Sequence, residues 1–346
     1  AKARANPFYT DEVAGPLDIR NFAGDIEAPV FLASATGDEQ TGPSFGDLLG
    51  EFESSSSVRT TFYNGLHADG FAPQIIAEWA AFLDLYVAER VPEISNGFRF
   101  ATPILTEGIF GGQVLLPPDR WGDVATHAEA LARWESEPEI RVLFDNGAGG
   151  DPGLPIAAWE ESARQWPPAA TVATRFFLGA RGTLTDGRSG DGPGTAVAFH
   201  PDPAVAGTSF HTSGAIWFAD QTWDWVPQAD GDTARFQTAP LADDVVMAGP
   251  ASADLWLRSD ATDAEIEVVL SEVRPDGQEL RVQAGQLQVS YRALDDSSTE
   301  LQPVQYGREE TWAPLVPDRW TEARVQIPSF AHAFRAGSSI RLTINT

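Results

Sequence analysis

The chain has 346 residues, and its 42% hydrophobic and 21% charged content is ordinary for a globular protein long enough for two domains. Its formal net charge of -27 makes nucleic acid and anionic membranes poor partners, because like charges repel. The absence of cysteine excludes disulfides and thiolate metal sites, and no apolar run reaches transmembrane length. None of these features indicates a compartment.

Strand and helix patterns alternate in the first 92 residues, in the order strand 30–35, helix 44–52, strand 58–63 and helix 73–91. The continuous apolar run of the first strand is typical of a parallel sheet covered on both faces. Two such strands are too few for a stable sheet. We therefore expect them to need further neighbours and to leave an apolar strand edge exposed within residues 25–65.

Residues 93–137 predict a connecting segment with one helix at 124–137. From residue 138 the hydrophobic period changes to two, and turn signals separate the strand patterns at 140–144, 175–178, 253–257, 266–270, 287–291, 325–327 and 340–344. Many short alternating strands predict a β-sandwich. We expect an α/β part at 1–92, a connection at 93–137 and a sandwich at 138–346. The strand pattern that runs to Thr346 predicts that the sandwich is cut short at its end.

The candidate site residues are Asp38 and His67, each of which follows one of the first two strands. An acid and then a histidine at successive strand ends match the last two members of an α/β-hydrolase triad, whose chain order is Ser, Asp, His. In such a triad the histidine is the general base and the carboxylate orients it. A solvent-exposed loop histidine and a turn aspartate are the alternative explanation.

A serine pattern near the site gives a third interpretation. Residues 42–46 match the G-x-S-x-G nucleophile pattern, with Ser44 at its centre. Against this, Asp38 precedes Ser44, and about eight residues separate the first strand from it, although a nucleophile turn follows its strand directly. Ser44 with Asp47 also fits a capping box at a helix start. No H-E-x-x-H or EF-hand pattern is present, and we expect no metal and no cofactor.

Several stretches resemble the X-Pro dipeptidyl-peptidase and cocaine esterase family of serine hydrolases. The strand, acid loop and histidine loop carry the first part of the likeness: 28–32 (APVFL), 37–42 (GDEQTG), 63–69 (YNGLHAD) and 82–87 (FLDLYV). The β-rich part carries the rest: 141–144 (RVLF), 166–168 (WPP), 177–179 (FLG), 249–251 (GPA), 255–261 (LWLRSDA) and 336–342 (AGSSIRL).

The resemblance implies a fold that is α/β plus all-β: the C-terminal remnant of an α/β-hydrolase domain, followed by a jelly-roll, galactose-binding-like sandwich. It implies that Asp38 is the triad acid and His67 the base, and that the chemistry is acyl transfer on a peptide or ester substrate. The nucleophile has no counterpart, so we expect a missing N-terminal hydrolase segment and an inactive chain. The competing hypothesis is a non-catalytic binding protein whose sandwich holds a ligand or partner.

Overall fold

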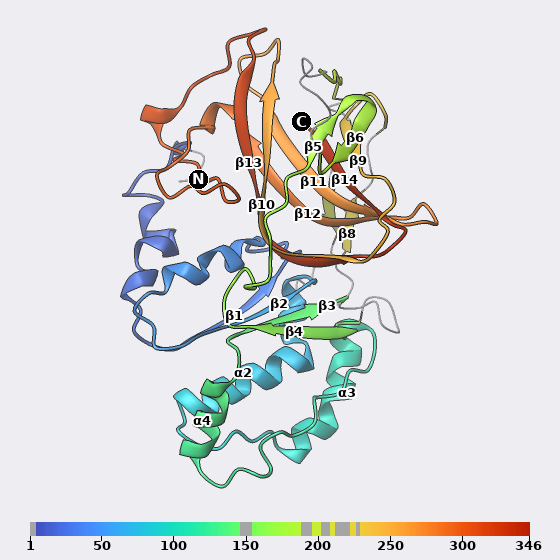
Figure 1. The fold of residues 1–346 in the computed structure, drawn as a ribbon. Helices are drawn as coiled ribbons and strands as arrows, with labels where there is room; N and C mark the ends of the chain where they lie inside the picture. Colours follow the sequence, from blue (N-terminus) through green and yellow to red (C-terminus); the bar gives the residue numbers. More distant parts are fainter. Residues whose placement is uncertain (1–4, 146–153, 188–195, 202–207, 212–221, 226–228) are drawn as a thin grey trace.

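The computed structural model describes residues 5–145, 154–187, 196–201, 208–211, 222–225 and 229–346. A four-stranded sheet in the order β1-β2-β3-β4 lies between a β-rich part and three helices (Figure 1). Its strands are β1 (Val30–Ala35), β2 (Val58–Tyr63), β3 (Ile140–Phe144) and β4 (Trp159–Ala163). The first three are parallel, and β4 is antiparallel to β3. In these ranges no helix is long and apolar enough to cross a membrane.

Each face of this sheet is covered by a different part of the chain. On one face Tyr63 and Leu143 pack against Ile75 of helix α2 (Pro73–Tyr86). On the other, Phe62 and Val142 pack against Ala333 of the β-rich part. The β-rich part therefore covers the second face of the sheet, which in many α/β proteins is covered by helices.

Strand β1 lies at the edge of the sheet and pairs with β2 alone among the described residues. Its first four residues are half-buried. The expected apolar edge within residues 25–65 is therefore present in the described part of the chain. Two strand predictions, 30–35 and 58–63, agree with β1 and β2 to the residue.

The β-rich part contains two sheets that share one hydrophobic core. One pairs β10 (Val245–Leu257) with β13 (Thr321–Phe334). The other has the order β12 (Glu279–Gln288), β11 (Glu265–Val273), β14 (Ser339–Asn345), β9 (Ala234–Gln237), β6 (Thr183–Thr185) and β5 (Phe177–Gly179). A separate hairpin joins β7 (Thr208–His211) and β8 (Thr222–Trp225).

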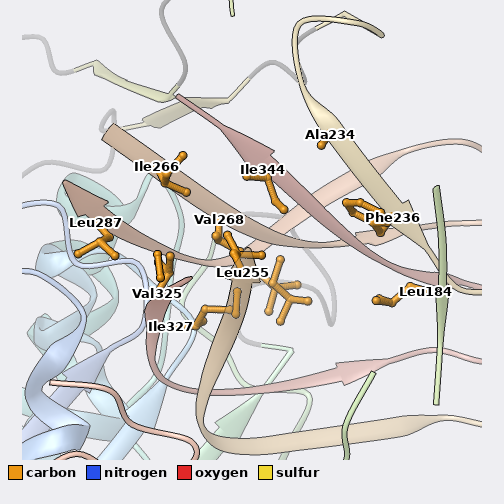
Figure 2. Close-up of a cluster of buried hydrophobic side chains, with 14 of the residues drawn as sticks. Leu184, Ala234, Phe236, Leu255, Ile266, Val268, Leu287, Val325, Ile327 and Ile344 are labelled. Atoms are coloured by element: carbon orange, nitrogen blue, oxygen red, sulfur yellow. The ribbon is translucent and has the colours of Figure 1, made fainter. Parts of the chain in front are cut away.

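Side chains from both sheets meet in the core, as Figure 2 shows for Leu255 and Val325 opposite Val268 and Ile344. Packing of two sheets around shared apolar side chains is the arrangement of a β-sandwich. The jelly-roll connectivity and the division at 1–92, 93–137 and 138–346 stay predictions.

Four element predictions need correction. Residues 140–144 form β3 of the first sheet, because they pair with β2 and not with a sandwich strand. Residues 289–291 form a 3-10 helix rather than a strand. The helix expected at 44–52 is a 3-10 helix, Ser44–Glu51. The helix expected at 73–91 ends at Tyr86, because the chain folds back so that the Asp84 carboxylate accepts hydrogen bonds from Arg90 and Glu93.

The connecting segment has two helices where one was expected, α3 (Asn96–Phe110) and α4 (His127–Ser136). Proline inside a helix is unfavourable, so Pro103 argues against a helix in this stretch when the sequence alone is considered. Its ends are nevertheless marked, since Ser95 accepts a hydrogen bond from the backbone of Phe98 and Gly111 has a φ of 72°. These are the usual N-cap and C-cap signals.

Candidate active site

The parallel pairing of β1 and β2 brings the two following loops together. Ala35 is level with Tyr63, and the pairing continues past both strand ends. The backbone N–H of Thr36 donates to the Tyr63 carbonyl at 3.0 Å, and that of Gly37 donates to the Gly65 carbonyl at 3.1 Å. The carboxyl ends of parallel strands meet at one edge, so the residues just beyond them, Asp38 and His67, become neighbours.

Asp38 is 8% exposed, and its two oxygens accept four hydrogen bonds. Oδ1 accepts from the backbone N–H groups of Gln40 and Thr41, each at 2.8 Å. Oδ2 accepts from the Thr41 hydroxyl at 2.9 Å and lies 2.9 Å from Nδ1 of His67. The structure therefore brings the two predicted site residues within hydrogen-bond distance.

The surroundings of Asp38 decide its charge. Burial raises the pKa of this carboxyl, but the hydrogen bonds from Thr41, His67 and Gln40 lower it more, so that the pKa lies below its ordinary value of 3.8. An ionised carboxylate can only accept hydrogen bonds, so Nδ1 of His67 must be the donor. A neutral ring in that tautomer carries its lone pair on Nε2.

His67 is held in place through its backbone as well as its ring. Its N–H donates to the Glu39 carboxylate at 3.0 Å, and the residue begins a 3-10 helix, His67–Phe71. Its side chain is 27% exposed, against 7% for that of Asp38. The buried acid and the more accessible imidazole are the arrangement that general-base catalysis needs, because the ring must reach a substrate.

Asp69 supports the histidine loop and was not predicted from the sequence. Its Oδ2 accepts a hydrogen bond from the backbone N–H of Leu66 at 2.7 Å. A side chain at Gly65 would place Cβ 2.4 Å from the same oxygen, so only glycine leaves room there. Burial, opposed by the Leu66 hydrogen bond and aided by the Glu39 charge, raises the pKa of Asp69 to about 6. The one sequence signal for this role was the spacing of Asp69, three residues after Leu66, because an acid at that distance from a helix N-cap is a common capping residue.

Ser44 is exposed at the start of its 3-10 helix, and eight residues separate it from Ala35, where β1 ends. The predicted capping box is wrong, because Pro43 is the N-cap residue and makes no side-chain cap. The carboxylate of Asp47 instead accepts hydrogen bonds from the Ser329 backbone at 3.1 Å and from Nε2 of Gln326 at 3.2 Å. In the part of the chain that the structure describes, no three His, Asp or Glu side chains are grouped so as to hold a metal ion.

The comparisons with known proteins agree on one group of relatives. Cocaine esterase from Rhodococcus sp. (strain MB1 Bresler) is 28% identical over 150 residues, which are 40% of this chain and 25% of the esterase. Two solved structures share the fold at 15% identity. An aminopeptidase from a Thaumarchaeota archaeon has a TM-score of 0.61 over 99% of this chain and 52% of its own. A CocE/NonD family hydrolase from Staphylococcus aureus has a TM-score of 0.57, and the match covers 93% of this chain and 47% of the hydrolase.

The chain thus spans a quarter of the curated relative and about half of each of these structural relatives. Residues 132–346, more than half of the chain, match the family described as the X-Pro dipeptidyl-peptidase C-terminal non-catalytic domain. Asp38 and His67 both precede the matched residues. These relatives support a hydrolase relationship and do not favour a non-catalytic binding protein. The chain belongs to the X-Pro dipeptidyl-peptidase and cocaine esterase family, with which it shares this C-terminal domain.

Proposed function

We propose that Asp38 and His67 are the acid and the general base of a serine hydrolase that cleaves amide or ester bonds by acyl transfer. The observation that carries this proposal is the 2.9 Å contact between Oδ2 of Asp38 and Nδ1 of His67. The lowered pKa of Asp38 supports it, because an ionised carboxylate holds the imidazole in the tautomer that a base needs.

In the proposed reaction, Nε2 of His67 takes the proton of a serine hydroxyl while the serine oxygen attacks the substrate carbonyl carbon. Asp38 stabilises the imidazolium that results. The imidazolium then gives its proton to the leaving amine or alcohol as the bond to the carbonyl carbon breaks. Water repeats the sequence on the acyl-enzyme, which releases the acid and restores the serine.

We place the nucleophilic serine in a hydrolase segment outside residues 1–346. The solved relatives are about twice as long as this chain, which supports this placement. The unpaired edge of β1 in the described structure supports it too, because a further parallel strand can pair there. The substrate is a peptide or an ester of small-molecule size, with no role for nucleic acid or membrane. The names of the relatives include both esterase and peptidase activities.

The test combines the coding DNA upstream of Ala1 with activity measurements. We expect that DNA to encode a strand followed by G-x-S-x-G, and we expect the longer protein to hydrolyse p-nitrophenyl acetate. Asp38→Asn should lower its kcat by a factor on the order of 10⁴, as loss of the orienting acid does in serine proteases. His67→Gln should also abolish turnover, whereas His200→Gln, at an exposed histidine, should not.

A fluorophosphonate probe separates the two serine candidates. Residues 1–346 alone should not be labelled, and the longer protein should be labelled in its upstream segment. Labelling of Ser44 in residues 1–346 would overturn our placement of the nucleophile. Full turnover by the His67→Gln variant would overturn the assignment of the base.

A further inference from the structure

One side chain of the sandwich reaches the acid loop of the candidate site. Gln283 lies on β12, and its Nε2 donates a hydrogen bond to the backbone carbonyl of Thr36 at 3.1 Å. The residue is 1% exposed, and 247 positions separate the two partners in the sequence. Its Oε1 accepts a hydrogen bond from the backbone N–H of Ala284 at 2.9 Å. Both ends of the amide are thus engaged, which defines its orientation.

An irregularity in β12 accompanies this contact. Gln283 pairs with Leu270 of β11, whereas Arg281 pairs with Ser271, so β12 carries one extra residue between them. An extra residue of this kind is a β-bulge, and bulges change the direction in which a side chain projects. β12 is also the edge strand of its sheet. The position and the direction of Gln283 are therefore built into the sandwich.

The backbone of Thr36 is held on both sides of its Cα atom. Its N–H donates to the Tyr63 carbonyl of β2, and its carbonyl accepts from Gln283 of the sandwich. Thr36 is 3% exposed, so removal of the Gln283 donor would leave a buried carbonyl without that bond. Asp38 follows only two residues later. The direction in which the chain leaves β1, and with it the position of the Asp38 carboxylate, depends on the Thr36–Gly37 peptide group whose carbonyl Gln283 contacts.

Other contacts already join the sandwich to the first sheet. Asp47 accepts hydrogen bonds from Ser329 and Gln326. Trp166 stacks on Phe62 with ring centroids 3.9 Å apart, and its indole N–H donates to the Ser329 hydroxyl of β13 at 3.2 Å. The two parts can therefore pack together without Gln283. What Gln283 adds is a contact next to the acid loop.

We infer that Gln283 is a positioning residue through which the domain described as non-catalytic holds Asp38 against Nδ1 of His67. Its catalytic meaning rests on the proposed function, but the geometry itself is measurable in residues 1–346. The consequence is that the acid and base meet correctly only while the sandwich is packed on the sheet.

The experiment follows the His67 Nδ1 proton by NMR, in protein labelled with ¹⁵N-histidine. Wild type should show a low-field resonance for this hydrogen-bonded proton, and Asp38→Asn should lose it. Gln283→Met keeps the length of the side chain but removes the donor. We expect this variant to lose the resonance, or to speed its exchange with water by about tenfold or more, the equivalent of one ordinary hydrogen bond.

Gln326→Met is the matched control. It removes a hydrogen bond between the same two parts of the chain, but the bond goes to Asp47 and not to the acid loop. We expect its Nδ1 resonance to match that of wild type. A folded Gln283→Met variant with an unchanged resonance would overturn the inference. Absence of the resonance from wild type would instead contradict the Asp38–His67 pair, and with it the proposed function.

Gln283→Glu is the second variant, for the case that Gln283→Met does not fold. A protonated glutamic acid can donate to the Thr36 carbonyl, whereas the ionised form cannot. Relative to wild type at each pH, its Nδ1 resonance should be retained in acid and lost as the pH rises. Equal behaviour of this variant and wild type across the pH range would contradict the positioning role.

Discussion

Asp38 is buried and yet ionised because donors surround its carboxylate. The two backbone N–H groups of Gln40 and Thr41 are fixed by the turn that contains them, so they need no reorganisation to bind the charge. Hydrogen bonds to a charged group are among the stronger ones in proteins. The same turn therefore keeps the acid charged and points its other oxygen at His67.

The charge of Asp38 predicts a pH-dependent contribution to stability. Its pKa is lower in the folded protein than its ordinary value of 3.8, so the contribution is complete above that value and is lost as the pH falls through the folded pKa. At pH 7 we expect Asp38→Asn to lower the free energy of unfolding by about 1–3 kcal/mol. Urea unfolding of both proteins should show the difference shrinking below pH 4. A difference that grows on acidification would contradict this assignment.

Asp69 predicts the opposite dependence. Its pKa is raised to about 6, so the folded protein holds a proton that the unfolded chain has lost, and stability falls as the pH rises from 4 through 6. Asp69→Asn avoids the buried charge and keeps an oxygen for the Leu66 N–H. We expect this variant to be more stable than wild type at pH 8, by on the order of 1–3 kcal/mol.

The measurement for Asp69 is urea unfolding at pH 4 and pH 8. At pH 4 the two proteins should have similar midpoints, because Asp69 then gains little from ionising in the unfolded chain. A stabilisation of equal size at both pH values would show that charge is not the cause.

At the level of elements, the 3-10 helix Ser44–Glu51 depends on a close approach to β2. A Cβ atom on Gly46 would lie 2.3 Å from Cε1 of Phe62 and 3.1 Å from Cβ of Ser329. Phe62 is fully buried and Ser329 is 1% exposed, so neither side chain can move aside. The helix can lie where it does, between the sheet and the sandwich, only because residue 46 is glycine.

This close approach predicts that Gly46→Ala lowers the free energy of unfolding by about 1–3 kcal/mol, through overpacking. Gly50→Ala is the control, because Gly50 belongs to the same helix and an added Cβ meets nothing within 4 Å. We expect that change to stay within about 0.5 kcal/mol of wild type. Chemical denaturation of both variants measures the difference. Equal effects of the two substitutions would argue against the close packing on Phe62.

At the scale of the whole molecule, the chain has 50 acidic residues and only 23 lysines and arginines. This excess makes the folded chain repel itself, although many individual arginines form ion pairs with nearby carboxylates. The Debye length falls from about 30 Å at 0.01 M salt to about 10 Å at 0.1 M. Long-range repulsion is therefore screened more strongly than the short ion pairs.

We expect the thermal unfolding midpoint to rise between 10 mM and 200 mM NaCl at pH 7.5. The rise should be about 1–2 °C for each kcal/mol of repulsion that is removed, because the unfolding entropy of 346 residues is large. Scanning calorimetry or circular dichroism measures it. A midpoint that falls with added salt would show that the ion pairs contribute more than the net repulsion.

Local sequence pattern was sufficient for the strands and loops that carry the site. The apolar run of β1 and the apolar and β-branched run of β2 specify strands through near neighbours alone, and their boundaries agree with the structure. Because both strands are parallel, the placement of Asp38 and His67 after them could also be predicted. The start of α2 at Pro73 followed from the same kind of local signal.

Contacts between distant residues were not predictable in this way. The strand at 140–144 looks like the sandwich strands in period and composition, and only its pairing with β2 assigns it to the first sheet. The α3 helix contains Pro103, whose cost must be offset by packing that a single sequence does not reveal.

The sequence by itself determined that an acid and a histidine follow two neighbouring buried strands, because hydrophobic period and turn residues act over short distances. Only the tertiary structure decided that the two side chains meet at 2.9 Å, that Asp38 is ionised, and that Gln283 of the sandwich holds its loop. The physical reason is that these properties depend on burial and on hydrogen-bond partners that lie far away in the sequence. Gln283 and its partner Thr36, for example, are 247 residues apart.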